Sequence, residues 1–373
     1  MTWHRELLKS KREITRFFLF FGALLALTVS ALPLQSSAES ASEKMQATMT
    51  VEKKTSSAAS SSNQSPSIRV LEKSYRQAWK LVRDNTLFSN RLTHWEDWEH
   101  RFDGKLKTED DLKNAIDKMV SAVGDQYTFF RNVVATTKHE ERDEETGMVS
   151  HSRLSHNIGY IAIVGFSSTN TADELENALK KLKNSSGLII DLRGNKGGYV
   201  EQAVEAYELL SDEGKFISIR GRQDGKKYLE DIDLEQDCLR RDLNGKVTVE
   251  ERRENLAGKK PILVLVDKDT RSAAEMLAGA LKDNHRAKLA GARTFGKGVV
   301  QNTWKLEPSC SIRITIAQYF LPSGKCINGL GLNPDISVKF PPDDESKALD
   351  ANERTKHISE LENALPSLIK SLI

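Results

Sequence analysis

The sequence predicts an α/β fold with a mainly parallel sheet, preceded by a small helical segment. Two stretches, 186–210 and 260–283, each contain a short apolar strand, a turn and an amphipathic helix. A third apolar run, 158–166, is rich in β-branched residues and precedes the helix pattern of 171–184. Strands that alternate with helices are typical of βαβ units, whose strands run parallel in one sheet.

The first 38 residues have the organisation of an export signal. Five basic residues precede the apolar run 17–34, and the small residues Ser36 and Ala38 follow it. The run is close to the minimum length that spans a bilayer, so a signal peptide cleaved after Ala38 and an uncleaved membrane anchor are both open. In either case we expect the body of the protein to be extracytoplasmic, in the periplasm or cell envelope, as a secreted or membrane-anchored protein.

Residues 39–66 are rich in Ser, Ala, Thr and Gln and contain almost no large apolar side chain, so we expect a disordered tether. Two amphipathic helix patterns follow, and we assign 67–132 to a small helical N-terminal domain. Thr108 is the expected N-cap of the second helix and Gly124 its end. The charged stretch 133–157 has no convincing periodicity and is interpreted as a linker.

We assign the α/β core to 158–340 and a helical tail to 341–373. Near the end of the core, 309–327 alternates like an antiparallel strand or hairpin. The charged insertion 222–255 separates the two strand-to-helix junctions, and we expect it to be a lid or a solvated loop. The tail is expected either to cover its own core or to dock against another chain.

The composition argues against several partners. Lysine and arginine total 55, and aspartate and glutamate total 53. This balance does not favour nucleic acid or an anionic membrane surface as the main partner. No His or Cys cluster has the spacing of zinc ligands, so we expect neither a metal nor another cofactor. The three cysteines, Cys238, Cys310 and Cys326, permit one disulfide or none.

The turns of the two junctions are expected at one edge of the sheet, where α/β folds usually carry their sites. In the second turn Ser272 precedes an apolar helix, where unpaired backbone N–H groups and the helix dipole favour a developing anion. The same position suits a simple N-cap, so a nucleophile and a cap are both open. In the first turn, Gly197 and Gly198 either offer N–H groups to an oxyanion or only form a tight turn.

Lys297 lies between two glycines in a short turn. A lysine that points into a dry pocket loses proton affinity and can act as a general base near neutral pH, whereas a lysine in an open turn is only solvated. His285 is the only histidine in the segment that contains Ser272, and a Ser272–His285 pair is the alternative. The residues alone do not decide between these interpretations.

Four segments together resemble a known family: 158–168, 187–205, 272–301 and 321–336. In the same order, they are similar to the signature blocks of the carboxyl-terminal processing proteases, also called tail-specific proteases, which are Ser/Lys peptidases of the S41 type. The GDQYT motif at 124–128 ends a helical segment that resembles the N-terminal domain of that family. The resemblance implies an α/β fold whose core is a twisted sheet of the Clp protease and crotonase type.

The resemblance also implies roles for individual residues. It places the nucleophile on Ser272, the general base on Lys297, and support for the orientation of that lysine on Gln301. The oxyanion donors fall on the N–H groups of Gly198 and Ala273. If the lysine turn is helical, the four-residue offset puts Lys297 and Gln301 on one face.

The chain departs from the family in one respect. Family members usually carry a PDZ domain that captures substrate tails, and here only 129–157 lies between the corresponding motifs. That interval is too short for a domain. Selectivity is therefore expected to come from the core cleft, from tethering through 17–34, or from an adaptor protein or homo-oligomer.

The sequence thus predicts an exported serine endopeptidase of the C-terminal processing type, without a PDZ domain. Its expected substrates are extended polypeptides, entering near the C-termini of exported proteins. Two other functions remain open. One is a non-catalytic scaffold or binding protein that retains the protease fold, and the other is an acyl-transfer enzyme of the crotonase type.

Overall fold

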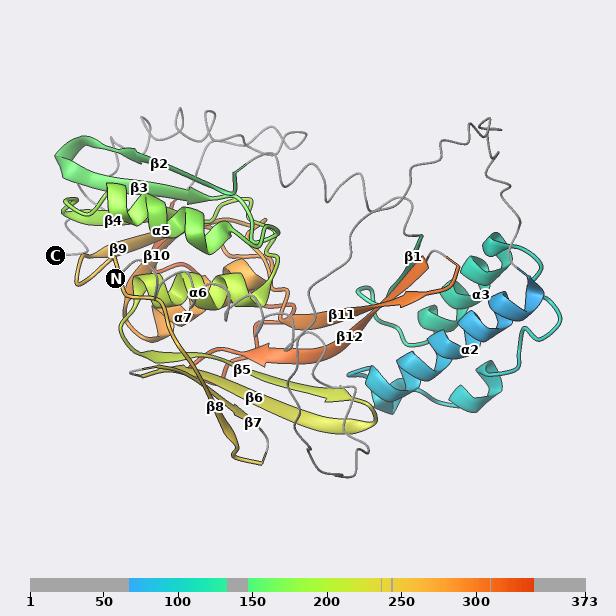
Figure 1. Cartoon of the computed structure of the whole chain (residues 1–373). Coiled ribbons are helices and arrows are strands. Elements are labelled where there is room, and N and C mark those ends of the chain that lie inside the picture. The colour runs from blue at the N-terminus through green and yellow to red at the C-terminus, as the bar shows by residue number, and fades with distance from the viewer. Residues whose placement is uncertain (1–66, 133–146, 236, 243, 309, 339–373) are drawn as a thin grey trace, which may run out of the picture. The chain divides into compact units, whose positions relative to one another are not determined.

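The computed structural model describes residues 67–132, 147–235, 237–242, 244–308 and 310–338 (Figure 1). These residues belong to one compact unit. The predicted signal or anchor, the predicted tether and the predicted C-terminal tail lie outside the described residues. Among the helices that are described, none combines the length and hydrophobicity needed to span a bilayer.

A six-stranded sheet forms one layer of the fold. Its strand order is β13-β10-β9-β4-β3-β2, and every pair is parallel except β2 with β3. The strands are β2 (Val149–Arg153), β3 (Ile158–Ile163), β4 (Gly187–Asp191), β9 (Ile262–Val266), β10 (Ala287–Gly291) and β13 (Ile336–Ser337). The predicted mainly parallel sheet is therefore confirmed. Every residue of the central strands β4 and β9 is buried, and all of them are apolar except Asp191 at the end of β4, because both faces of the sheet are covered.

Three helices follow the strands of this sheet: α5 (Thr171–Lys181), α6 (Val200–Leu210) and α7 (Ala273–Asp283). Helix α7 contacts both β10 and β5, a strand of the second sheet, and Figure 1 shows α6 and α7 between the two sheets. The α7 residues from Ala273 to Leu281 are all buried, which explains why this stretch is apolar on every side except at Glu275.

The second sheet has seven strands and is antiparallel. Its order is β1-β12-β5-β6-β7-β8, with β11 also paired to β12. The strands are β1 (Phe129–Asn132), β5 (Gly214–Gln223), β6 (Lys226–Leu234), β7 (Cys238–Asp242), β8 (Val247–Glu250), β11 (Val299–Leu306) and β12 (Cys310–Phe320). The antiparallel strand predicted within 309–327 is present as β12.

The charged insertion 222–255 is not the predicted lid or loop, because most of it forms β6, β7 and β8. Some of its charges are paired across neighbouring strands. Arg240 of β7 lies 2.9 Å from Glu230 of β6 and 3.1 Å from Glu250 of β8. Cross-strand pairs of opposite charge stabilise a sheet, yet in the sequence they resemble a solvated loop.

Two helices precede the sheets, α2 (Ile68–Asn85) and α3 (Glu109–Ser121), with the short 3₁₀ turns η1 (Ser89–Arg91) and η2 (Trp95–Trp98) between them. A third 3₁₀ turn, η4 (Ser155–Asn157), precedes β3. Thr108 caps α3 in a capping box, as expected: its hydroxyl accepts a bond from Asp111 N–H, and the Asp111 carboxylate accepts one from Thr108 N–H. Buried side chains of both helices share one hydrophobic cluster with the sheets, and β1 pairs with β12.

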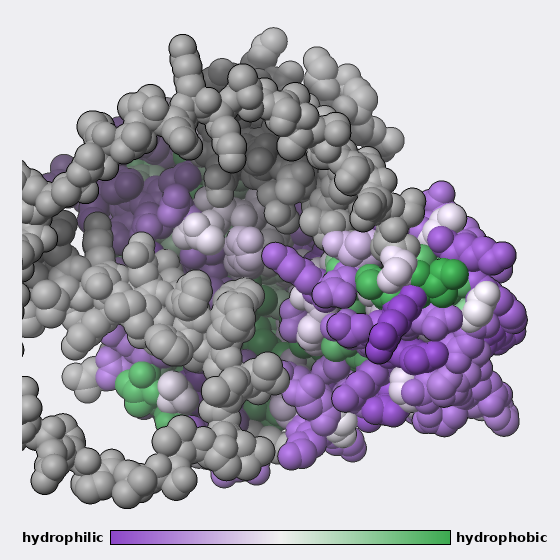
Figure 2. Space-filling model, turned by 45° about the vertical axis from the view of Figure 1, so that its right-hand side comes forward, coloured by the Kyte–Doolittle hydropathy of each residue, from purple (hydrophilic) through white to green (hydrophobic). Residues whose placement is uncertain are grey.

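The visible described surface in Figure 2 is mainly hydrophilic, with small separate hydrophobic patches. Cys238, Cys310 and Cys326 are all free thiols. Within the described ranges, the exposed large hydrophobic side chains are Ile68, Tyr199, Val247, Val249, Phe295 and Leu330. Three of these, Tyr199, Phe295 and Leu330, lie in or beside the turns that carry the predicted site.

Candidate active site

The turns after β4 and β9 are bonded to each other. The two strands are parallel neighbours, so their carboxyl ends lie at one sheet edge. The Asp267 carboxylate accepts bonds of 3.0 and 2.9 Å from Gly194 N–H. Arg271 N–H donates to the carbonyl oxygen of Asn195 at 2.9 Å. The Gly-rich turn and the Ser272 turn therefore lie side by side, as the sequence predicts.

Ser272 occupies the N-cap position of α7 in an unusual backbone conformation. Its φ is 57° and its ψ is −125°, a region that L-residues rarely enter and that favours glycine. The side chain is half-buried. Non-glycine residues with strained backbones are concentrated at active sites, and they persist only where surrounding contacts hold them.

The Gly197–Gly198 turn packs directly on Ser272. A Cβ atom added to Gly197 would lie 2.8 Å from Ser272 Cβ and 3.0 Å from Ala273 N. At Gly198, where φ is +152°, an added Cβ would lie 2.2 Å from the carbonyl oxygen of Phe166. Any side chain at either position would push the turn away, so both glycines are required for the close approach.

The N–H groups of Gly198 and Ala273 donate to no other group among the described residues. The turn around Gly198 is nonetheless fixed, because Phe166 N–H donates to Gly197 O at 3.0 Å and Tyr199 N–H to Phe166 O at 2.8 Å. Ala273 begins α7, where the helix dipole favours negative charge. Two free N–H donors beside Ser272 are the arrangement that an oxyanion requires.

Glu275 joins the serine turn to the lysine turn, although it is not among the residues that the sequence predicts for the site. Its side chain is fully buried and accepts four hydrogen bonds. One carboxylate oxygen, Oε2, accepts Ser272 N–H at 3.0 Å and Lys297 N–H at 2.9 Å. The other, Oε1, accepts the Thr294 hydroxyl at 2.5 Å and Gly296 N–H at 2.7 Å.

This shared acceptor limits the separation of Ser272 and Lys297. Since both N–H groups donate to the same oxygen, their nitrogen atoms lie no farther apart than the sum of the two bond lengths. Burial raises the pKa of Glu275, and the four donors oppose that shift. A sequence signal existed, because Glu275 stands three residues after Ser272, at the capping-box position, and is the only charge in an apolar helix start.

Lys297 is half-buried in a closely packed turn. An added Cβ on Gly296 would lie 2.6 Å from Gly331 N, and one on Gly298 would lie 2.5 Å from Asn328 N. The Lys297 ammonium lies 5.3 Å from the centre of the Tyr127 ring, which belongs to the GDQYT motif. The lysine is therefore not in an open, solvated turn.

The electrostatic surroundings favour the neutral form of Lys297. Its pKa is lowered to about 8, first by burial and then by the positive charges of Arg313 and Arg271, while Glu275 opposes these effects. A neutral amine accepts a proton, so a lysine with this pKa can act as a general base near neutral pH.

Gln301 does not share a helix face with Lys297, because the lysine turn is not helical and Gln301 lies in β11. The expectation based on a four-residue helical offset is thus wrong. Gln301 faces Thr315 across the β11–β12 pair. Its Nε2 is buried and has no hydrogen-bond partner among the described residues.

The alternative Ser272–His285 pair is excluded by the length of α7. Ser272 precedes the first residue of this helix and His285 follows its last turn. The helix rises about 1.5 Å per residue. The two side chains therefore lie at opposite ends of an 11-residue helix and cannot form a hydrogen bond.

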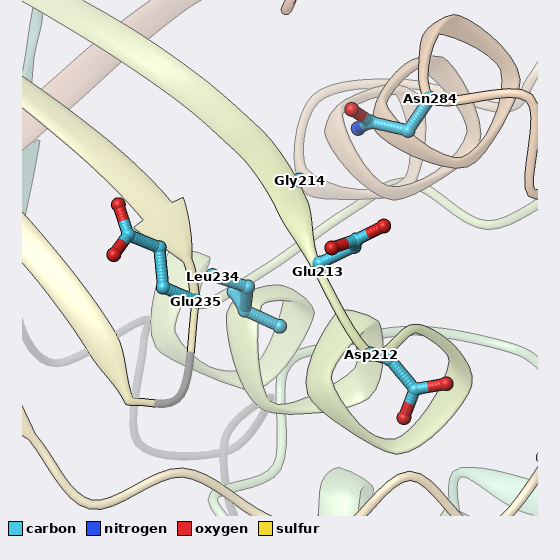
Figure 3. Close-up of a pocket in the computed structure, with 6 residues that line it drawn as sticks. All are labelled: Asp212, Glu213, Gly214, Leu234, Glu235 and Asn284. Atoms are coloured by element: carbon cyan, nitrogen blue, oxygen red, sulfur yellow. The ribbon is translucent and has the colours of Figure 1, made fainter.

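A separate pocket is lined by Asp212, Glu213, Gly214, Leu234, Glu235 and Asn284 (Figure 3). None of these is a predicted site residue, and Figure 3 shows the carboxylates of Asp212 and Glu235 pointing away from each other. The Asn284 amide donates to the Tyr207 hydroxyl and to two backbone carbonyls, which is a structural role. Within the described ranges, no group of three His, Cys, Asp or Glu side chains could hold a metal ion.

Comparison with known proteins gives a family and a fold. Residues 157–338 match the model of peptidase family S41. The carboxy-terminal-processing protease of Bartonella bacilliformis is 31% identical over 264 residues, which are 68% of this chain and 56% of that protein. The carboxy-terminal processing protease CtpA of Bacillus subtilis is 34% identical over 227 residues, 60% of this chain and 44% of that protein. The chain thus spans about half the length of these relatives.

Two solved structures share the fold. The photosystem II D1 C-terminal processing protease aligns with a TM-score of 0.55 and 19% identity, over 73% of this chain and 95% of that one. A lipoprotein from Streptococcus agalactiae aligns with a TM-score of 0.56 and 17% identity, over 83% of this chain and 100% of that one. These matches confirm the predicted fold class.

Proposed function

We propose that this chain, whose residues 157–338 belong to peptidase family S41, is an exported serine endopeptidase of the C-terminal processing type, with Ser272 as nucleophile and Lys297 as general base. The observation that carries the proposal is the Glu275 carboxylate, one oxygen of which binds the backbone N–H groups of both residues. A nucleophile and its base must lie within hydrogen-bond reach of each other, and a shared buried acceptor supports this because it keeps the backbones of the two residues close together.

The reaction begins when neutral Lys297 takes the proton of the Ser272 hydroxyl, whose oxygen attacks the carbonyl carbon of the scissile peptide bond. The resulting oxyanion accepts hydrogen bonds from Gly198 N–H and Ala273 N–H. The protonated lysine then donates its proton to the leaving amine, and the peptide C–N bond breaks. In the second half, Lys297 activates a water molecule, which hydrolyses the acyl-serine.

Gln301 is proposed to support this cycle by orienting the lysine side chain from β11. Its unpaired, buried amide supports the assignment, because such a group needs a partner that the described residues do not supply. The partner can be the lysine amine or a group of the bound substrate.

An extended polypeptide is the proposed substrate. Tyr199, Phe295 and Leu330 are 42–57% exposed. Tyr199 directly follows Gly198, Phe295 directly precedes Gly296, and the backbone of Leu330 lies against Gly296. An apolar rim around a turn with free N–H groups suits the side chains of an unfolded chain. We propose that exported proteins supply it near their C-termini, because the relatives are C-terminal processing proteases and the N-terminus resembles an export signal.

The test is digestion of an unstructured reporter protein by the purified full chain at pH values from about 6 to 10. Wild type should cleave it, and both Ser272→Ala and Lys297→Ala should not. Lys305→Ala, an exposed lysine on β11, is the matched control and should cleave normally. Cleavage that survives in Ser272→Ala would contradict the mechanism. Absence of cleavage by the wild type would favour a scaffold or binding protein with the protease fold.

A further inference from the structure

Three buried side-chain atoms on β11 and β12 have no hydrogen-bond partner among the described residues: Gln301 Nε2, Arg313 Nε and Thr315 Oγ1. We call these three residues the Arg313 cluster. Eight such atoms occur in the described part of the chain, so this one place holds three of them. Buried polar groups in native proteins are nearly always paired, and a group of unpaired ones calls for an explanation, such as an absent ligand.

The strand register puts the cluster on one face of the sheet. Gln301 and Thr315 are direct cross-strand partners, and Arg313 is two residues from Thr315 along β12. Side chains two residues apart point to the same face, and direct cross-strand partners have Cβ atoms about 4.5–5.5 Å apart. The three groups can therefore contact one small ligand together.

The cluster lies beside the proposed catalytic lysine. Arg313 is the first of the two positive charges that lower the pKa of Lys297. Thr315 N–H donates to the hydroxyl of Thr128, and the neighbouring Tyr127 ring faces the Lys297 ammonium. The GDQYT turn thus contacts both the cluster and the lysine.

The cluster contains hydrogen-bond donors and positive charge without a matching anion. Arg313 is half-buried, and no carboxylate of the described residues forms an ion pair or hydrogen bond with it. Its pKa is lowered by burial and by the positive charge of Arg131. The Glu275 carboxylate near Lys297 already accepts four donors. A guanidinium and an amide N–H group can only donate, so the missing partner must be an acceptor.

We propose that the Arg313 cluster is a subsite that binds a carboxylate of the polypeptide substrate. The planar carboxylate accepts two bonds from the guanidinium fork, and its remaining lone pairs accept the Gln301 amide and the Thr315 hydroxyl. The carboxylate is either the chain terminus or an Asp or Glu side chain. This inference rests on the proposed function only in taking the ligand to be a polypeptide.

The experiment measures peptide binding to the full chain with Ser272→Ala, which removes the proposed nucleophile, by fluorescence anisotropy. One peptide pair differs only in a free C-terminal carboxylate against a carboxamide. A second pair has blocked ends and differs only in an internal Glu against Gln. We expect one pair to show a Kd lower for the carboxylate form by about tenfold to a hundredfold. The pair that discriminates identifies the source of the carboxylate.

The preference should fall below about threefold when Arg313→Met is added, because methionine keeps the apolar stem and removes the fork. Arg153→Met, on β2 of the other sheet, is the matched control and should keep the full preference. Since a substitution within a sheet can unfold a protein, Gln301→Glu is a second variant. It places an internal carboxylate beside Arg313 and should also abolish the preference.

The inference is overturned if neither peptide pair discriminates, or if the preference survives both Arg313→Met and Gln301→Glu. Its failure is distinguishable from that of the proposed function because binding is measured without cleavage. An Arg313-dependent preference in a chain whose wild type cleaves nothing supports the subsite and refutes the protease. Cleavage by the wild type without any carboxylate preference supports the protease and refutes the subsite.

Discussion

Replacement of Glu275 by glutamine tests the contact on which the proposed active site depends. An amide keeps one oxygen and puts an NH₂ group where the second oxygen was, opposite two N–H or O–H donors. Two of the four donors therefore lose their acceptor. Each unpaired buried donor costs about 1–3 kcal/mol, so Glu275→Gln should lower the free energy of unfolding by about 2–6 kcal/mol. That is a large part of the stability of a typical domain.

The same substitution should also lower kcat, because the Ser272 and Lys297 turns lose a shared acceptor and separate. A misplacement of about 1 Å can reduce a rate about a hundredfold, so we expect kcat to fall at least tenfold with a smaller change in KM. Unfolding in urea, followed by tryptophan fluorescence, gives the stability, and cleavage of a fluorogenic peptide gives the kinetic constants.

Glu208→Gln is the matched control for this experiment. Glu208 is also buried, and burial raises its pKa as well, but its Oε2 accepts only one backbone bond, from Arg253 N–H at 3.0 Å. The glutamine oxygen can replace that acceptor, so kcat should not change. If Glu275→Gln loses less than about 1 kcal/mol, or if its kcat equals that of Glu208→Gln, the role assigned to Glu275 is refuted.

Four further predictions concern the same site. Because the pKa of Lys297 is lowered to about 8 and its neutral form is the base, kcat/KM should rise tenfold per pH unit below about pH 8 and level off above it; a profile that is flat from about pH 6 to 8 would contradict this. In the unfolded chain Lys297 keeps its proton up to about pH 10.4, whereas in the folded protein it loses the proton above about pH 8. The free energy of unfolding should therefore rise between about pH 8 and 10. Gly198→Ala brings a Cβ within 2.2 Å of Phe166 O and should reduce kcat about 10²–10³-fold through loss of an oxyanion donor, whereas kcat within threefold of wild type would exclude that role. Tyr127→Leu should reduce kcat about two- to fivefold because the ring face over the Lys297 ammonium is lost, and Tyr127→Phe should restore it; equal loss in both variants would point to the hydroxyl instead.

The sequence identified the elements that depend on local patterns. β9 and the first four residues of β4 are continuous runs without a polar side chain, and the carboxyl ends of parallel neighbours must meet at one sheet edge. This rule predicts that the Gly198 and Ser272 turns lie together before any coordinate is known. The Thr108 cap follows in the same way from a local hydrogen-bonding preference.

The parts that sequence reasoning misplaced depend on long-range pairing. Gln301 would share a face with Lys297 only if the lysine turn were helical, but pairing with β12 keeps this segment extended. The 222–255 insertion resembles a solvated loop because its charges are visible in the sequence, whereas the partners that neutralise them across the sheet are not. Glu275 was missed for the same reason, since three of its four donors, Thr294, Gly296 and Lys297, come from another part of the chain.

The backbone of Ser272 explains why this turn needs so many contacts. A non-glycine residue at φ 57° and ψ −125° costs about 1–3 kcal/mol, and a glycine there would relieve most of that strain. Glycine has no hydroxyl, so the proposed reaction requires the strained residue. Arg271 N–H bonded to Asn195 O and Ser272 N–H bonded to Glu275 hold the turn from both sides. These two bonds also fix Ser272 beside the Gly-rich turn and the Lys297 turn, so the contacts that offset the strain are the ones that set the geometry of the proposed active site.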